Sequence, residues 1–281
     1  MARNSFTSGA SGKNARNENF PVASILLPKH LRSHVMAFYN FARGGDDVAD
    51  DPNLGSDEKL LILNNMEKTL LGGNPSGDAL FPAVKVMRLS LSETGVSAIY
   101  CRDLLKAFRQ DAVKGRYASM QELLDYCLLS AAPVGRYLMD ISGKSPSDID
   151  TTPSDALCVA LQLLNHLQDM KIDYLDLDRV YLPADWMKEY SADPSDLAAE
   201  KMSAPLKNVS DRMIIEIDKL LLAAAPLGQM LSGPLGREAS GIREIAQRLS
   251  NKLKHSDQLS NRVELGKIKS LFWFFRGAMM G

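Results

Sequence analysis

The chain has 281 residues, of which 45% are hydrophobic and 24% are charged, a balance that excludes disordered and fibrous proteins. Its 33 lysines and arginines nearly cancel its 34 aspartates and glutamates, so the net charge of −1 does not attract nucleic acid and we expect no nucleic-acid partner. Cys101, Cys127 and Cys158 are widely spaced without a CxxC pair, which predicts neither a disulfide framework nor a zinc site. They favour a reducing compartment, so we expect a cytoplasmic protein.

The chain shows no sign of a secretory or membrane-spanning segment. Residues 1–17 are small and polar without an apolar stretch, which predicts a disordered tail rather than a signal peptide. The longest uncharged stretch, residues 220–236, contains Pro226 and Pro234 and is too polar to span a bilayer. No linker divides the remainder, so residues 18–281 are expected to form one domain.

Apolar residues recur at helical spacing along nearly the whole chain, which predicts an all-α fold. The first predicted helices cover residues 28–47, 57–71, 79–92 and 97–113. Ser119 and Glu122 form a capping box that opens the next helix, and Pro133 is expected to kink it. Thr152 is expected to cap the following helix, with Pro153 at its first position. The last predicted helices cover residues 195–202, 204–225 and 240–255.

The first predicted helix ends in an acidic cluster. Asp46 and Asp50 are four residues apart, as are Asp47 and Asp51, and such like-charged pairs destabilise a helix by roughly 0.2–0.5 kcal/mol each. The cluster therefore needs either open solvent or bound cations. Arg43, one turn earlier on an apolar helix, favours a phosphate held through Mg²⁺, and a solvated helix end is the alternative.

A second polar cluster lies on the mostly apolar helix predicted after residue 152. Gln162, Asn165, His166, Asp169 and Asp173 recur there at helical spacing. Buried carboxylates are costly without partners, so this stripe either faces solvent or coordinates Mg²⁺, which prefers oxygen ligands. We interpret His166 as a core or supporting group rather than a metal ligand. Because both clusters lie on apolar helices, we expect them to meet at one apolar cavity around a metal–diphosphate group.

Four segments of the chain carry a resemblance to a known family. They read ENFPVASILLP at 18–28, AFYNFARGGDDVADDP at 37–52, DYCLLSAAPVG at 125–135 and LQLLNHLQDMKIDYLDLDRVYLP at 161–183. Together they resemble the squalene/phytoene synthase family of head-to-head isoprenoid synthases, and within it the branch that forms hydroxysqualene for hopanoid biosynthesis. The resemblance implies one catalytic domain over residues 18–281, folded as a helical bundle around a central apolar cavity.

The resemblance also implies roles for individual residues. The implied metal ligands are Asp46, Asp47, Asp50, Asn165, Asp169 and Asp173. The residues implied in diphosphate binding are Arg43, Arg179, Tyr181, Gln162 and Asn165. Those implied to line or support the substrate cavity are Phe20, Tyr39, Tyr126, Val134, Gly135 and Asp111. The implied catalytic set is Asp46, Asp50, Asp169, Asp173, Tyr39 and Arg43.

For the hydroxysqualene branch, the resemblance implies that presqualene diphosphate reacts with water to give hydroxysqualene and diphosphate. Mg²⁺, or Mn²⁺ in its place, is the implied cofactor, and no NADPH is expected. The implied partner is an isoprenoid diphosphate, and enzymes of the same pathway are further candidates. Two alternatives stay open: head-to-head condensation of two prenyl diphosphates to presqualene diphosphate, squalene or phytoene, and a non-enzymatic helical lipid-binding protein with an acidic cation site.

The C-terminal segment is aromatic and basic. Residues 271–275 read LFWFF, and Lys267, Lys269 and Arg276 flank them. One interpretation is a last helix docked on the core. The other is an anchor in the membrane interface, because the implied hydrocarbon product is nearly insoluble in water. The segment is too short to span a bilayer, so this second interpretation predicts a cytoplasmic protein with peripheral membrane association.

Overall fold

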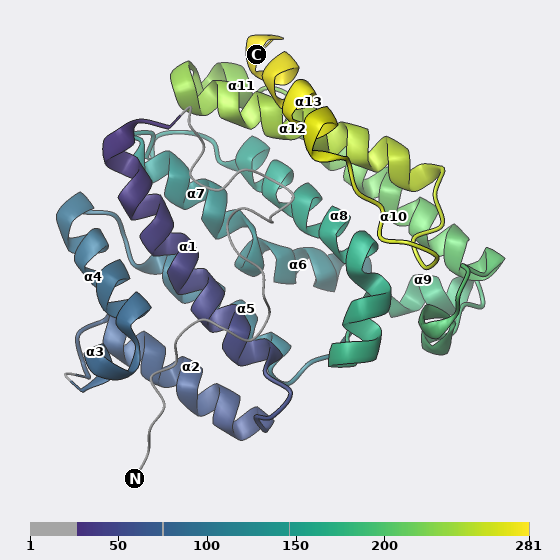
Figure 1. The fold of residues 1–281 in the computed structure, drawn as a ribbon, viewed down its shortest axis with the longest axis horizontal. Helices are drawn as coiled ribbons and strands as arrows, with labels where there is room; N and C mark the ends of the chain where they lie inside the picture. Colours follow the sequence, from purple (N-terminus) through teal and green to yellow (C-terminus); the bar gives the residue numbers. More distant parts are fainter. Residues whose placement is uncertain (1–26, 75, 146, 281) are drawn as a thin grey trace.

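The computed structural model describes residues 27–74, 76–145 and 147–280, so the predicted tail, the domain start at residue 18 and Phe20 lie outside the described residues. Helices dominate the described chain (Figure 1), which confirms the all-α prediction. The N-terminal helices are α1 (Lys29–Asp50), α2 (Ser56–Leu70), α3 (Gly77–Leu80), α4 (Pro82–Thr94), α5 (Ile99–Asp111), α6 (Met120–Ser130) and α7 (Ala132–Ile141). They are followed by α8 (Thr152–Leu177), α9 (Ala184–Glu189), the 3₁₀ helix η1 (Pro194–Ala198), α10 (Ala204–Ala223), α11 (Leu227–Leu231), α12 (Gly233–Lys254) and α13 (Lys267–Met280).

Proline residues divide two of the predicted helices. Pro82 lies in the first turn of α4, so the helix predicted over residues 79–92 is split into α3 and α4. Pro133 lies in the first turn of α7, and the backbone leaves helical geometry at Ala131, where φ is −122°. The kink predicted at Pro133 is therefore a complete break between α6 and α7. Proline suits the first turn of a helix but not its interior, because it has no N–H to donate.

The predicted helix starts are confirmed at α6 and corrected at α8. The Ser119 hydroxyl accepts a hydrogen bond from the backbone N–H of Glu122 at 3.3 Å, as predicted. The Glu122 carboxylate accepts from the backbone N–H of Ala118, so the second bond of the predicted capping box is shifted by one residue. Thr152, by contrast, is the first helical residue of α8 and not its cap. Its backbone N–H and its hydroxyl both donate to the Asp150 carboxylate, at 3.0 and 2.7 Å. The carboxylate two residues earlier therefore satisfies the helix start in place of the threonine.

Two short strands in the described chain were not predicted. β1 (Arg116–Tyr117) pairs in parallel with β2 (Val180–Pro183), and the backbone N–H of Val180 donates to the Gly115 carbonyl at 2.9 Å. All four residues of β2 are buried, so the strand lacks the alternation that would have revealed it. The pairing brings the chain that follows α8 against the chain that follows α5.

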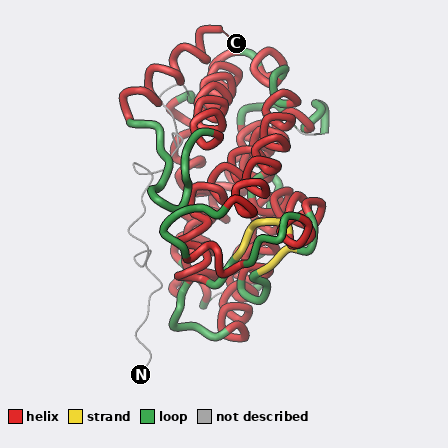
Figure 2. Tube along the Cα trace, turned by 90° about the vertical axis from the view of Figure 1, so that its right-hand side faces the viewer, coloured by secondary structure: helices red, strands yellow, loops and turns green. Residues whose placement is uncertain are grey.

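The long helix α8 lies at the centre of the fold. It packs against α6, α7, α10 and α12, while α1 packs against α2, α4 and α5 (Figure 1). One hydrophobic cluster surrounds α8, and a second lies between α1, α2, α4 and α5. Figure 2 shows the long helices side by side with the strand pair at one side. Among the described helices, none has the length and apolar character needed to cross a bilayer.

The C-terminal helix α13 is docked on α12. Phe274 and Ala278 are buried, and a Cβ added at Gly277 would meet the Ser240 carbonyl oxygen at 2.6 Å, so only glycine permits this close approach. The Arg248 guanidinium lies 3.9 Å from the centroid of the Trp273 ring. The inner face of α13 therefore has the contacts expected of a last helix packed on the core.

Candidate active site

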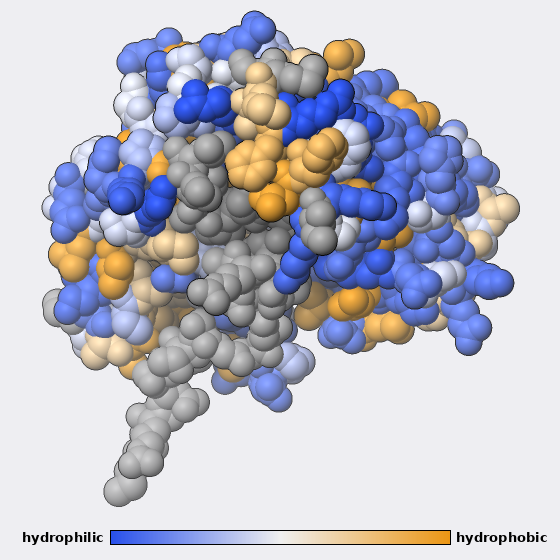
Figure 3. All heavy atoms as spheres, turned by 45° about the horizontal axis from the view of Figure 1, so that its top comes forward, coloured by the Kyte–Doolittle hydropathy of each residue, from blue (hydrophilic) through white to orange (hydrophobic). Residues whose placement is uncertain are grey.

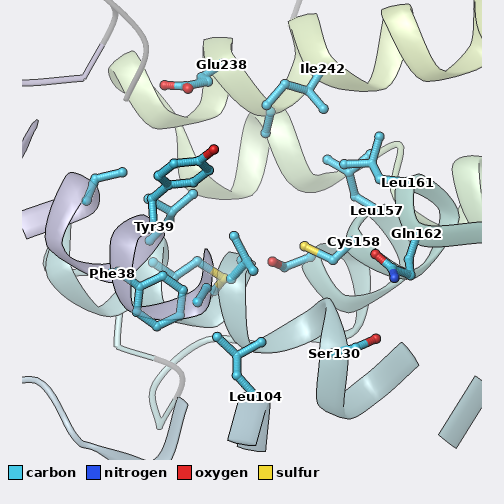
Figure 4. A pocket seen from close by; sticks show the side chains of 18 of the residues that line it. Phe38, Tyr39, Leu104, Ser130, Leu157, Cys158, Leu161, Gln162, Glu238 and Ile242 are labelled. Carbon is cyan, nitrogen blue, oxygen red and sulfur yellow. The ribbon is translucent and has the colours of Figure 1, made fainter. Parts of the chain in front are cut away.

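An apolar cavity of about 420 Å³ lies between α1, α5, α6, α7, α8, α11 and α12 (Figure 4). Its wall is mostly aliphatic and aromatic, as the predicted central cavity requires. Eight of the sequence-predicted site residues line it: Tyr39, Arg43, Asp46, Tyr126, Val134, Gly135, Gln162 and Asn165. They come from α1, α6, α7 and α8, so helices distant in sequence contribute to one site.

The C-terminal half of α1 carries the first acidic cluster into this cavity. Tyr39, Arg43 and Asp46 are spaced by four and three residues, so they share one face of the helix. The Arg43 guanidinium forms ion pairs with Asp46 at 2.7 Å and with Asp47 at 3.0 Å. The predicted cluster therefore contains a cation of its own, and this cation lines the cavity together with Asp46.

Close packing with α5 fixes the position of this cluster. Gly45 is buried directly before Asp46, and a Cβ at this position would meet the Phe108 ring at 2.5 Å. Because a larger residue would push α1 away from α5, glycine is needed for the observed contact. Val48 and Ala49 are also buried, so the acidic residues extend from a helix whose other face is part of the core.

Arg179 connects the end of α1 to α5 and β2. It is 7% exposed, and its guanidinium donates to the Asp50 carboxylate at 2.5 Å, to the Ala49 carbonyl at 2.9 Å and to the Asp111 carbonyl at 3.1 Å. Burial opposes its charge, but the nearby acidic groups Tyr181, Asp111 and Asp50 outweigh burial and raise the pKa of Arg179. This arginine therefore stays charged where it contacts the first acidic cluster.

Asp111 accepts hydrogen bonds from two tyrosines beneath the cluster. The Tyr126 hydroxyl donates to it at 2.8 Å and the Tyr181 hydroxyl at 3.1 Å. Burial raises the pKa of the Asp111 carboxyl to about 6, against the opposing effect of Arg179 and the two hydroxyls. Burial also raises the pKa values of Tyr126 and Tyr181 well above the usual tyrosine range, so both remain hydrogen-bond donors. Tyr181 thus contacts Asp111 and lies outside the cavity wall.

His166 belongs to the same buried aromatic group. Its ring stacks on Tyr181 with 3.7 Å between centroids, and the Tyr126 ring stacks on Tyr181 with 5.7 Å between centroids. Burial, with a smaller effect of Arg179, lowers the pKa of His166 to about 3, so the imidazole is neutral. The structure places His166 as a packing group beside the site, consistent with the interpretation of it as a supporting residue.

The second polar cluster contributes its two amide side chains to the cavity. Gln162 and Asn165 line the cavity wall, whereas Asp169 and Asp173, farther along α8, are not among the described residues that line it. Asp169 accepts two hydrogen bonds from the Arg262 guanidinium, at 2.6 and 3.1 Å. The backbone carbonyl of Asp173 accepts a hydrogen bond from the backbone N–H of Arg179 at 3.0 Å. Since the Arg179 side chain holds Asp50, this residue joins the ends of the two clusters.

Three residues of the site were missed in the sequence. Arg262 lies in the loop between α12 and α13, where no periodic pattern reveals its neighbours. Lys59 of α2 donates to the Ala49 carbonyl at 2.8 Å, and burial followed by the charge of Arg179 lowers its pKa. Glu238 lines the cavity from α12 and is 4% exposed. Its spacing from Leu235 and Ile242 on the apolar face of this helix is a signal that could have found it.

The oxygen atoms of the predicted metal ligands are of the kind that binds hard divalent cations such as Mg²⁺. Among the described residues, no three His, Cys, Asp or Glu side chains converge in the way a metal site made only of protein groups would require. Mg²⁺ is commonly bound by one or two carboxylates together with substrate phosphates and water, so such a convergence is not needed. Asp46 and Asp50 on α1, with Asn165 and Asp169 on α8, supply oxygen atoms of this kind.

Comparison with known proteins identifies the family of the chain. Residues 14–269 match the family described as squalene/phytoene synthase. The chain is 41% identical to the hydroxysqualene synthase of Rhodopseudomonas palustris, over 96% of this chain and 90% of that protein. It is 37% identical to the hydroxysqualene synthase of Zymomonas mobilis, over 93% of this chain and 87% of that protein. The fold matches the crystal structure of squalene synthase HpnC from Alicyclobacillus acidocaldarius with a TM-score of 0.72 and 26% identity. The match covers 85% of this chain and 88% of that protein. The chain is therefore a member of the squalene/phytoene synthase family of isoprenoid synthases.

Proposed function

We propose that this enzyme converts presqualene diphosphate and water to hydroxysqualene and diphosphate, in a reaction that depends on Mg²⁺ and needs no NADPH. The observation that carries the proposal is that residues of both polar clusters line one apolar cavity: Arg43 and Asp46 from α1, and Gln162 and Asn165 from α8. A diphosphate suits the polar end, and hydrocarbon chains suit the remainder. The similarity over nearly the full length to two proteins named hydroxysqualene synthase favours this branch of the family.

The polar end would hold the diphosphate and the ions that accompany it. Enzymes of this family generally use a divalent metal. Asp46, Asp50, Asn165 and Asp169 would bind Mg²⁺, and when bound the ion would neutralise charge that develops on the leaving group. Arg43 lines the cavity and would donate charge-assisted hydrogen bonds to phosphate oxygens. Asp47 and Asp173 extend the two clusters, and Tyr181 and Asp111 would hold Arg179 in position.

The apolar wall would protect the carbocation left after diphosphate departs. Phe38, Tyr39 and Tyr126 contribute aromatic rings to the cavity. The faces of such rings attract cations, and a wall without bulk water prevents premature hydrolysis. Val134 and Gly135 add small apolar surface from α7, which leaves room for a large hydrocarbon. These residues would shape the cavity, while the acidic clusters act on the leaving group.

Product analysis tests the proposal directly. Purified protein is incubated with presqualene diphosphate and Mg²⁺ without NADPH, in ¹⁸O-labelled water. The expected product is a hydroxylated triterpene that carries the label, and excess EDTA should abolish its formation while added Mn²⁺ restores it. Turnover in excess EDTA would contradict the metal requirement. Consumption of farnesyl diphosphate with release of presqualene diphosphate, squalene or phytoene would favour the condensation alternative. No reaction with any prenyl diphosphate would leave the lipid-binding alternative.

We also propose that the outer face of α13 contacts a membrane from the cytoplasmic side. Leu271, Phe272 and Met279 are 57%, 60% and 81% exposed on this face, although Phe274 on the inner face is buried. Figure 3 shows hydrophobic atoms gathered there beside strongly hydrophilic ones. Such a surface suits the interface of an anionic membrane, where a hydrocarbon product can pass directly into lipid. Enzymes of the same pathway remain proposed partners at this surface.

Vesicle co-sedimentation tests the membrane contact. The variant Leu271→Gln/Phe272→Gln/Met279→Gln alters only exposed positions, and Leu222→Gln on α10, which is 75% exposed, is the matched control. Wild type and control should bind vesicles of phosphatidylserine and phosphatidylcholine, less so at high salt, and the triple variant should not. Equal binding by all three proteins, or binding by none, would contradict this proposal.

A further inference from the structure

Glu238 places a carboxyl group in an otherwise apolar part of the cavity. It lies on α12 between Leu235 and Ile242, lines the cavity and is 4% exposed. The acidic clusters on α1 and α8 do not include this residue, and nothing in the binding of diphosphate requires it. Glu238 is therefore a carboxyl group of the cavity wall without a role in holding the leaving group.

Glu238 lies beyond the diphosphate end of the cavity. Figure 4 shows Glu238 projecting from α12 above Tyr39, which rises from α1. Tyr39 and Asp46 are seven residues apart on the same helix, which corresponds to about 10 Å at 1.5 Å per residue. Among the described residues that line the cavity, Asp46 and Glu238 are the only carboxylic acids. The two acids are therefore separated, one at the polar end and one among hydrocarbon side chains.

The proposed reaction needs a proton acceptor in this part of the cavity. The reacting carbon is bonded to the diphosphate oxygen, so it lies just deeper than the diphosphate, toward Tyr39. After that bond breaks, a water oxygen bonds to the carbocation and forms an oxonium ion, which must lose one proton. Ser130 and Ser154 also line the cavity, but neutral hydroxyl groups are poor proton acceptors. A carboxylate accepts the proton readily.

We infer that Glu238 is the catalytic residue that holds the attacking water and accepts its proton, an inference that rests on the proposed hydroxysqualene synthesis. Its carboxylate accepts a hydrogen bond from the water, whose lone pair forms the new C–O bond. One proton then moves from the oxonium oxygen to the carboxylate, which leaves the neutral alcohol and a protonated Glu238. Release of this proton to solvent with the products restores the carboxylate.

The role of Glu238 is tested by the ratio of the alcohol formed to the diphosphate released. In Glu238→Gln, diphosphate release should remain within about threefold of wild type, because ionisation depends on the polar end of the cavity. The yield of alcohol per diphosphate released should fall by about tenfold or more. The remaining carbocation should lose a C–H proton and appear as hydrocarbon alkenes. A residue that only supports the fold would lower both yields together, so their ratio distinguishes the two roles.

Matched variants complete the experiment. Glu244→Gln removes a carboxylate from the same helix, where it pairs with Arg248 and Arg276 outside the cavity, and should leave the product ratio unchanged. Glu238→Met suits the apolar wall and replaces the glutamine variant if that variant does not fold by circular dichroism. An unchanged ratio of alcohol to diphosphate in either Glu238 variant would overturn the inference. Failure of wild type to form the alcohol at all would instead overturn the proposed function.

Discussion

The two acidic clusters of the site differ in where their counter-charges come from. Asp46 and Asp47 pair with Arg43, which is three and four residues away on the same helix. Asp169 pairs with Arg262, which is 93 residues away and comes from the loop before α13. The first cluster therefore has a counter-charge for two of its acids on its own helix, and only Asp50 depends on a distant residue, Arg179. The second becomes complete only when the C-terminal part of the chain folds over α8.

The clusters also differ in how firmly their arginines are held. Arg179, which holds Asp50, has an 8% exposed side chain and three acceptors on α1 and α5. The Arg262 side chain is 34% exposed and contacts Asp169 and Glu264. Water screens the Arg262–Asp169 pair far more than the Arg179–Asp50 pair, so only the Arg179–Asp50 pair should contribute strongly to stability. An arginine–aspartate pair is therefore expected to stabilise the fold in the first cluster and to have little effect on stability in the second.

The largest expected effect is on catalysis and is common to both clusters. Asp50→Asn and Asp169→Asn should each lower kcat by about 10²–10³-fold, because each removes a charge that would hold a metal at the leaving group. Steady-state product formation with presqualene diphosphate measures this. Asp176→Asn, an exposed acid near the end of α8, is the matched control and should retain kcat within about twofold of wild type. Full activity of Asp169→Asn would show that the second cluster lies outside the catalytic site.

The next effect should separate the clusters by stability. Arg179→Met leaves Asp50 and two backbone carbonyls without their buried donor, so the free energy of unfolding should fall by about 3–5 kcal/mol. Urea denaturation followed by circular dichroism measures the change. Arg102→Met removes a pair with Glu67 whose arginine is 44% exposed, and this control should change stability by less than about 1 kcal/mol. Equal losses in both variants would show that burial does not distinguish the pairs.

The local parts of the site could be predicted from sequence, and the non-local parts could not. Helical periodicity and the spacing of acids depend on neighbours within one or two turns, so the polar face of α1 and the stripe on α8 were found. The pairing of Asp169 with Arg262 depends on how the loop after α12 returns to α8. β2 was missed because its four residues are all buried. Glu238 has a local signal, its place on the apolar face of α12, but the cavity around it is formed by other helices and does not show in that pattern. A family resemblance supplied roles for residues but none of these contacts.

Titration of Asp111 tests the support beneath the first cluster. Its pKa is raised to about 6 in the folded protein from the ordinary 3.8, so the folded state holds the proton more tightly than the unfolded state. The resulting stabilisation is complete below the unfolded pKa and is lost as the pH rises through about 6. This shift corresponds to about 3 kcal/mol.

The stability difference between wild type and Asp111→Asn should therefore fall by that amount as the pH rises from about 3.5 to 6.5. Urea denaturation at several pH values measures it, with Asp125→Asn, which alters a surface acid on α6 that accepts from Gln121, as the matched control. A difference that stays constant across this range would contradict the assigned environment of Asp111.

The smallest expected effect concerns the exposed pair of the second cluster. Arg262→Gln removes the charge that contacts Asp169 but keeps donors for a hydrogen bond, so the free energy of unfolding should change by no more than about 1 kcal/mol. The residual difference should vanish at about 1 M NaCl, where the Debye length is about 3 Å, because the guanidinium is accessible to solvent ions. Parallel urea titrations at low and high salt measure both quantities. A loss as large as that of Arg179→Met, or one insensitive to salt, would show that Arg262 stabilises the fold as strongly as Arg179 does, and the two clusters would then be equivalent in this respect.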